Sequence, residues 1–118
     1  HLSGYVLLDP SSRPAGLAAL AAARDAGWST SVDPQAAPAL TPEFPGWVAG
    51  VDLLLPNADE LAALGDGVHG AVGAVAATAG AEGATWTDAR GTWSVPAPVV
   101  EVRDPTGAGD AFDAGLLR

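Results

Sequence analysis

The chain has 118 residues, with 5 basic against 14 acidic side chains and a formal net charge of −9. A surface this acidic repels nucleic-acid phosphates and anionic lipid, so we expect neither nucleic acid nor a membrane surface as a partner. The chain has no Cys, which excludes disulfides and a Cys nucleophile and agrees with a reducing, cytoplasmic location.

The first third of the chain predicts two strands separated by one helix. Residues 5–8 are a short apolar run closed by an Asp-Pro pair, which favours a buried strand. Pro14 suits the first position of a helix over 15–26, and Gly27 suits its end. Residues 28–32 then favour a second strand.

The middle of the chain continues this alternation. Thr41-Pro42 is typical of a helix start, and predicts a short helix towards residue 49. Residues 51–55 favour a third strand. Asn57 is a candidate N-cap, with Glu60 as the third helical residue, for a helix that ends near residue 64.

The last third predicts further strands and a closing helix. These are a strand over 74–78, a β-hairpin of 85–88 and 92–95, a strand over 99–102, a loop over 104–109 and a helix over 110–117. Alternating strands and helices indicate an α/β fold with a mostly parallel sheet. At this length the chain holds one domain at most, residues 1–118.

The segment from Asp104 to Phe112 carries the most chemical information. It follows a predicted strand and opens a helix, and its Gly107 and Gly109 let the backbone approach a ligand closely. Backbone N–H groups at a helix start favour an anion such as phosphate, and Asp110 beside them suits a general base. The alternative is that Asp110 merely caps the helix.

Two familiar phosphate-binding motifs are excluded. A Walker A loop requires a Lys, and the chain contains none. A dinucleotide fingerprint would need a third Gly where Phe112 stands.

The same segment resembles the second signature of the ribokinase (PfkB) family of carbohydrate and nucleoside kinases, D-T-T-G-A-G-D-A-F, with Pro105 in place of the first Thr. Four further stretches are similar to family motifs in the same order. They are residues 1–5 (h-x-S-G-Y), 31–35 (s-x-D-P-N, with Gln35 for Asn), 57–60 (N-x-x-E) and 78–83 (T-x-G-x-x-G).

The resemblance implies a role for each matching residue. Asp110 would be the catalytic base, and the N–H groups of Gly107, Ala108 and Gly109 the anion hole. Asn57 and Glu60 would organise the nucleotide and Mg²⁺, the latter through water. The remaining matches are nucleotide-binding Thr78, Gly80, Glu82 and Gly83, and Asp104 and Thr106 beside a monovalent cation, commonly K⁺.

Taken without the resemblance, several of these residues have simpler explanations. Asn57 and Glu60 form an ordinary capping-box pattern, and the stretch 78–83 is an ordinary exit from a strand. Asp33 follows a predicted strand and is first a strand end, although ligands of α/β sheets also bind at that edge.

The resemblance implies an enzyme that moves the γ-phosphate of ATP to a hydroxyl of a small sugar. The alternatives are a nucleoside kinase of the same family and a truncated remnant that binds nucleotide without catalysis. The similarity covers the middle and later part of the family's domain, so the fold should be incomplete relative to the family. We expect an unpaired sheet edge and a bare apolar face. The 118 residues alone would then aggregate, pair with a second copy as a homo-oligomer, or be part of a longer polypeptide.

The glycine-rich stretch 65–73 leaves little room for the further helix that the family places before the fourth strand. Either the helix over 57–64 is itself the crossover between two parallel strands, or a segment is missing from this stretch.

Overall fold

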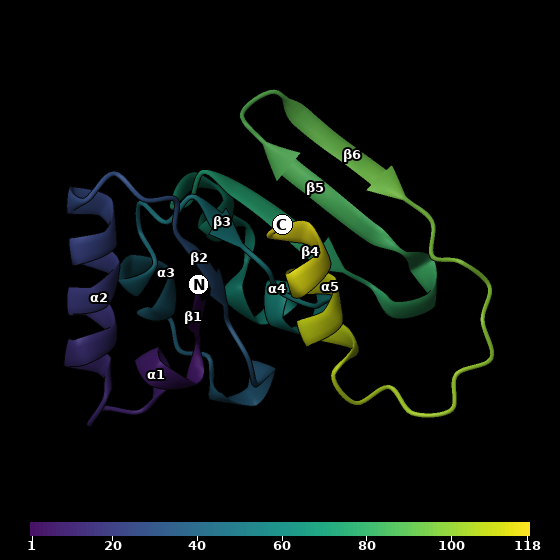
Figure 1. Ribbon diagram of the computed structural model, residues 1–118, viewed down its shortest axis with the longest axis horizontal. Helices are drawn as coiled ribbons and strands as arrows, with labels where there is room; N and C mark the ends of the chain where they lie inside the picture. The colour runs from purple at the N-terminus through teal and green to yellow at the C-terminus, as the bar shows by residue number, and fades with distance from the viewer.

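Six strands form one sheet whose spatial order follows the chain, from β1 to β6, in a computed structural model that describes residues 1–118 (Figure 1). Strands β1 to β4 pair in parallel, and β5 and β6 add an antiparallel hairpin. The strands are β1 (Leu2–Ser3), β2 (Ser31–Asp33), β3 (Leu53–Leu54), β4 (Ala74–Thr78), β5 (Ala84–Asp88) and β6 (Gly91–Val95). The expected α/β fold with a mostly parallel sheet and a hairpin is confirmed.

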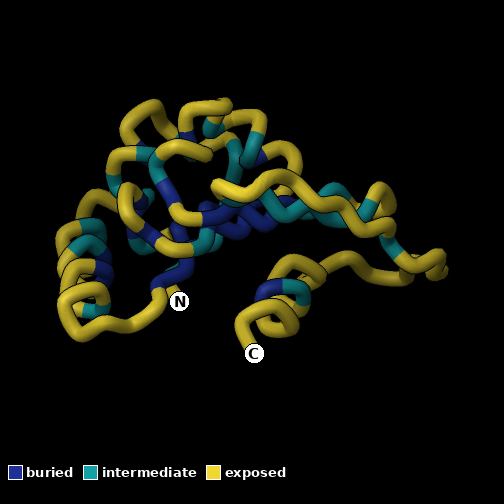
Figure 2. Tube along the Cα trace, turned by 90° about the horizontal axis from the view of Figure 1, so that it is seen from above, coloured by how far each residue is buried: buried dark blue, intermediate teal, exposed yellow.

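Helices connect the parallel strands and one more helix ends the chain. They are α1 (Tyr5–Leu8), α2 (Arg13–Asp25), α3 (Phe44–Trp47), α4 (Ala58–Leu64) and α5 (Ala108–Leu116), with short 3₁₀ turns at Ala37–Ala39, Asp66–Gly70 and Gly80–Glu82. Helices α3 and α4 cover one face of the sheet, and α5 lies on the other face (Figures 1 and 2). Helix α4 is the crossover between β3 and β4, as one of the two expectations had it. None of these helices has the length and apolar character that crossing a membrane requires.

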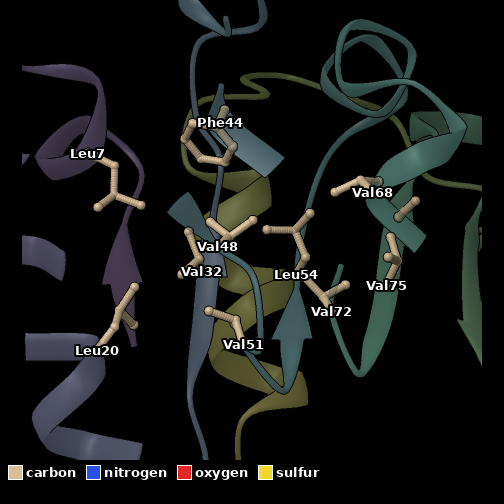
Figure 3. Close-up of a cluster of buried hydrophobic side chains, with 11 residues drawn as sticks. Leu7, Leu20, Val32, Phe44, Val48, Val51, Leu54, Val68, Val72 and Val75 are labelled. Carbon is tan, nitrogen blue, oxygen red and sulfur yellow. The ribbon is translucent and has the colours of Figure 1, made fainter. Parts of the chain in front are cut away.

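The hydrophobic core lies between the sheet and helices α1 to α4 (Figure 3). Phe44 of α3 is its largest fully buried side chain, and it contacts Trp47 edge-on at 5.8 Å between ring centroids. The guanidinium of Arg13 lies over the other aromatic ring, 3.8 Å from its centroid, and so joins α2 to α3. Complete burial of one Leu, Val or Phe side chain contributes about 1.5–3 kcal/mol, so each residue of this layer stabilises the fold substantially.

The prediction of a strand over residues 5–8 is wrong, because these residues form helix α1. The strand is the preceding pair, Leu2–Ser3, and it ends where the Gly4 N–H donates to the Asp33 carbonyl at 2.7 Å. The chain then turns, which buries Leu7 and leaves Tyr5 exposed. A run of four apolar residues fits one helical turn as well as a strand.

The predicted strand over residues 99–102 is also wrong. These residues have no strand partner, and Val99 is fully exposed. After β6 the chain leaves the sheet in an extended loop and returns to its other face at α5 (Figure 1). The β-branched residues here favour a strand, but no neighbouring strand lies beside them to form hydrogen bonds.

The other elements occur where they were expected, with shifted bounds. The second and third strands are shorter than predicted, beginning at Ser31 and Leu53, and the last helix begins two residues earlier, at Ala108. Gly27 ends α2 with a positive φ of 72°, as its position predicted.

The close approach of Gly4 to the end of β2 gives a test of the fold. A Cβ at Gly4 would overlap with the carbonyl of Pro34, whereas one at Gly46, in α3, meets nothing within 4 Å. We expect Gly4→Ala to lower the free energy of unfolding by about 1–3 kcal/mol in denaturant titrations. Gly46→Ala, the matched control, should leave it unchanged or raise it by up to about 1 kcal/mol. Equal effects of the two variants would contradict the packing described.

Candidate active site

Two adjoining cavities lie where the carboxyl ends of β2, β3 and β4 face the start of α5. The first has a volume of about 210 Å³ and a polar lining that includes four carboxylates, Asp33, Glu60, Asp110 and Asp113. The second, of about 340 Å³, has a mostly apolar lining from the β4–β5 turn, the loop after β6 and α5. Thr78, Ala108 and Gly109 line both. This edge of a parallel sheet is where α/β proteins bind ligands.

Asn57 and Glu60 form a reciprocal pair at the start of α4. The Glu60 N–H donates to Asn57 Oδ1 at 2.9 Å, and the Asn57 N–H donates to Glu60 Oε2 at 2.8 Å. Asn57 Nδ2 also donates to Glu60 Oε1 at 2.8 Å, so each carboxylate oxygen has a donor. Burial raises the pKa of Glu60, with a contribution from the charge of Asp33, and the Asn57 donors oppose that rise.

The same pair is tied to the next strand. Asn57 forms an isolated parallel bridge with Thr78, whose N–H donates to the Pro56 carbonyl at 3.0 Å. Thr78 is the last residue of β4 and lies between the two cavities. The capping box predicted from the sequence therefore also fixes the wall that both cavities share.

The first turn of α5 supplies backbone donors to the polar cavity. Gly107 precedes the helix with a φ of 75°, a conformation that glycine adopts readily. The Ala108 N–H donates to the Pro105 carbonyl at 3.1 Å, whereas the N–H groups of Gly109 and Asp110 have no acceptor in the chain. Free N–H groups and the helix dipole make this end favourable for an anion. The exposed side chain of Asp110 lies beside them.

Asp33 is fixed at the end of β2 by Gln35. The Gln35 N–H donates to Asp33 Oδ1 at 3.0 Å, and its side-chain amide donates to Oδ2. Gln35 and Ala36 have φ values of 59° and 39°, a strained conformation for residues with a Cβ. Burial raises the pKa of Asp33, the Gln35 N–H opposes this rise, and the charge of Asp110 adds to it.

Asp113 is the fourth carboxylate of the polar cavity, and its place there was not predicted from the sequence. It is only 6% exposed and is the one buried residue of α5, and its carboxylate accepts no hydrogen bond. Burial raises the pKa of Asp113 to about 6, with further contributions from the charges of Asp33, Asp110 and Glu60. Its spacing of three residues from Asp110 places both on one helix face, which is the signal that could have found it.

The other predicted site residues are divided between the apolar cavity and the surface. Gly80 and Gly83 line the apolar cavity. Glu82 is exposed and lines neither cavity, and the same holds for Asp104 and Thr106. The Thr106 N–H donates to Asp104 Oδ1 at 2.9 Å, which closes a turn just before the α5 start.

Neither cavity is lined by an Arg or His side chain. The only attraction that the chain offers an anion here is the backbone of the α5 start, close to four carboxylates. Cations that accompany an anionic ligand would reduce this repulsion.

The sequence pattern of the pfkB family carbohydrate kinases matches residues 1–118, the whole chain. The protein therefore belongs to this family of kinases, as the motifs indicated. Over 38 residues it is 58% identical to the aminoimidazole riboside kinase of Salmonella typhimurium, a stretch that is 32% of this chain and 12% of that protein.

Solved structures of related kinases have the same fold over this part of their chains. The aminoimidazole riboside kinase of Salmonella enterica, solved with aminoimidazole riboside and an ATP analogue, is 31% identical, with a TM-score of 0.81 over 98% of this chain and 45% of that one. The adenosine kinase of Sinorhizobium meliloti is 26% identical, with a TM-score of 0.87 over 98% and 40%. The fructokinase of Vibrio cholerae, solved with fructose, ADP and calcium, is 27% identical, with a TM-score of 0.80 over 99% and 44%. The chain thus spans less than half the length of these relatives.

The buried charge of Asp113 predicts a pH-dependent effect on stability. The pKa of Asp113 rises from 3.8 to about 6 on folding, so the folded state favours the protonated, neutral form of the side chain. The contribution of this neutral form to stability is complete below pH 3.8 and is lost as the pH rises through 6. Asp113→Asn removes this loss, so without divalent cations the variant should melt a few degrees above the unmodified protein at pH 7.5. That gain should shrink towards pH 4.

Thermal unfolding followed by circular dichroism at pH 4, 6 and 7.5 measures this effect. Asp25→Asn, at the exposed end of α2, is the matched control and should show no such trend. A gain for Asp113→Asn that is equal at all three pH values would contradict the electrostatic explanation.

Proposed function

We propose that the protein is an ATP-dependent phosphotransferase that moves the γ-phosphoryl group to a hydroxyl of a small sugar. Residues 1–118 would be one partial ribokinase-like domain that contains its nucleotide-binding and catalytic portion. The observation that carries the proposal is the position of Asp110, beside two free backbone N–H groups at the mouth of a polar cavity that adjoins an apolar one.

Asp110 acts as the general base in this proposal. Its carboxylate accepts the proton of the acceptor hydroxyl, whose oxygen then forms the new bond to phosphorus. The N–H groups of the Gly107–Gly109 segment stabilise the negative charge of the phosphoryl oxygens. In this structure the N–H of Gly109 is available for that role, while that of Ala108 donates to the loop.

The polar cavity suits a Mg²⁺ ion that keeps its water molecules. Its lining offers carboxylate oxygens and no positive side chain, but no three carboxylates converge closely enough to hold a bare ion. Glu60, fixed by Asn57, is the proposed contact through water, which is a common way for proteins to bind Mg²⁺. When bound, Mg²⁺ supplies positive charge that offsets the charge of the phosphates.

Other contacts of the nucleotide fall on the apolar cavity. We assign the adenine ring to this cavity, because its apolar lining includes Phe112 and suits a flat ring. Thr78, Gly80 and Gly83 form its wall, and Glu82, in the same turn, is proposed to reach the ribose. A monovalent cation such as K⁺ would lie at Asp104 and Thr106, directly before the anion-binding segment.

A nucleoside is the second candidate acceptor. The stretch with 58% identity belongs to an aminoimidazole riboside kinase, and an adenosine kinase has a TM-score of 0.87 to this chain. The fructokinase similarity supports the sugar. Both acceptors present a hydroxyl, so both are compatible with the role of Asp110.

Replacing the proposed base tests the mechanism. Asp110→Asn keeps the size of the side chain but accepts no proton, so kcat should fall by about 10²–10⁴-fold. A coupled assay of ADP release, run with panels of sugars and nucleosides, measures the rate and also separates the two acceptor classes.

Asp25→Asn, exposed at the far end of α2, is the control and should keep full activity. Near-normal turnover by Asp110→Asn would remove Asp110 as the base. These 118 residues can be inactive when isolated, because they form a partial domain. Absence of ADP release with every acceptor, in a folded full-length protein that contains them, would contradict the proposed function itself.

A further inference from the structure

The carboxylates of the polar cavity differ in how they are held. Gln35 donates to both oxygens of Asp33, and Asn57 donates to both oxygens of Glu60. Asp113 has no donor, although it is the most buried residue of its helix, at 6% exposure. A charged carboxylate in so buried a residue is unfavourable unless water or a ligand reaches its oxygens.

The oxygens of Asp113 are not enclosed by protein. No side-chain oxygen or nitrogen that is shielded from solvent lacks a hydrogen-bond partner in the structure. Since Asp113 accepts no hydrogen bond, its oxygens are accessible to solvent, and Asp113 is one of the residues that line the polar cavity. A ligand in the cavity can therefore contact it.

The charge of the surroundings defines the kind of ligand. Asp33, Asp110 and Glu60 all act on Asp113 with the same negative sign, and no Arg or His side chain lines the cavity to offset them. A neutral hydroxyl would leave this repulsion in place, whereas a divalent cation would reduce it for every carboxylate at once.

We propose that Asp113 is a further cation-binding residue of this cavity. Together with Glu60, it contacts a hydrated divalent cation. The inference rests on the proposed function only for its choice of Mg²⁺ as the natural ion. It concerns binding in the absence of nucleotide and acceptor. Asp113 provides the charge, while Gln35 and Asn57 keep the neighbouring carboxylates in place.

The test measures Mn²⁺ binding to the protein without nucleotide, by electron paramagnetic resonance of the free ion. Asp113→Asn should raise the Kd for Mn²⁺ by about tenfold or more. Asp25→Asn removes the same charge from an exposed site and should change the Kd by less than about twofold. Titrations in 0.15 M and 0.5 M NaCl separate a contact, which persists, from a long-range field, which salt screens.

Asp113→Glu keeps the charge on a longer stem and should recover part of the lost affinity, which a purely structural role would not produce. The inference is overturned if Asp113→Asn binds Mn²⁺ as tightly as the unmodified protein, if its effect disappears in 0.5 M NaCl, or if the unmodified protein binds no Mn²⁺. Since no turnover is measured, failure here is distinguishable from failure of the proposed kinase activity, which the ADP-release assay reports.

Discussion

The pairing of Asn57 with Glu60 is the interaction on which the site depends most. It begins α4, because it satisfies donors at the helix start that would otherwise lack acceptors. It holds a buried carboxylate at the cavity, and through the bridge to Thr78 it joins the crossover to β4. A single pair of side chains therefore links a local helix start to the geometry of both cavities.

Helix α5 brings two opposite electrostatic features to one place. Its first turn presents N–H groups that favour an anion, and one turn later Asp113 presents a buried negative charge. The N–H groups attract anions and repel cations, whereas the Asp113 carboxylate attracts cations and repels anions. Together they suit a ligand that contains both signs, which is the character of a polyphosphate with bound metal ions.

The sequence was sufficient for the type and order of most elements, because proline, glycine and capping residues mark their ends. It was insufficient for residues 5–8 and 99–102, where short apolar runs depend on which neighbours the chain finds. At the site, residues inside contiguous motifs were predicted, and the structure brings Asn57, Glu60 and Asp110 to one cavity. Asp113 was not found, since its burial and its proximity to Asp33 and Glu60 depend on how distant parts of the chain come together.

The order of the sheet has a consequence for how the chain acquires its structure. Every strand pairs with the strand that follows it in the sequence, so no pairing must wait for a distant segment. Pairing with the next strand along the chain closes shorter loops than pairing with a more distant strand would, and so lowers the entropy lost on closing each loop. During synthesis each new strand emerges next to an edge that is already formed, so the sheet can grow in the direction of translation.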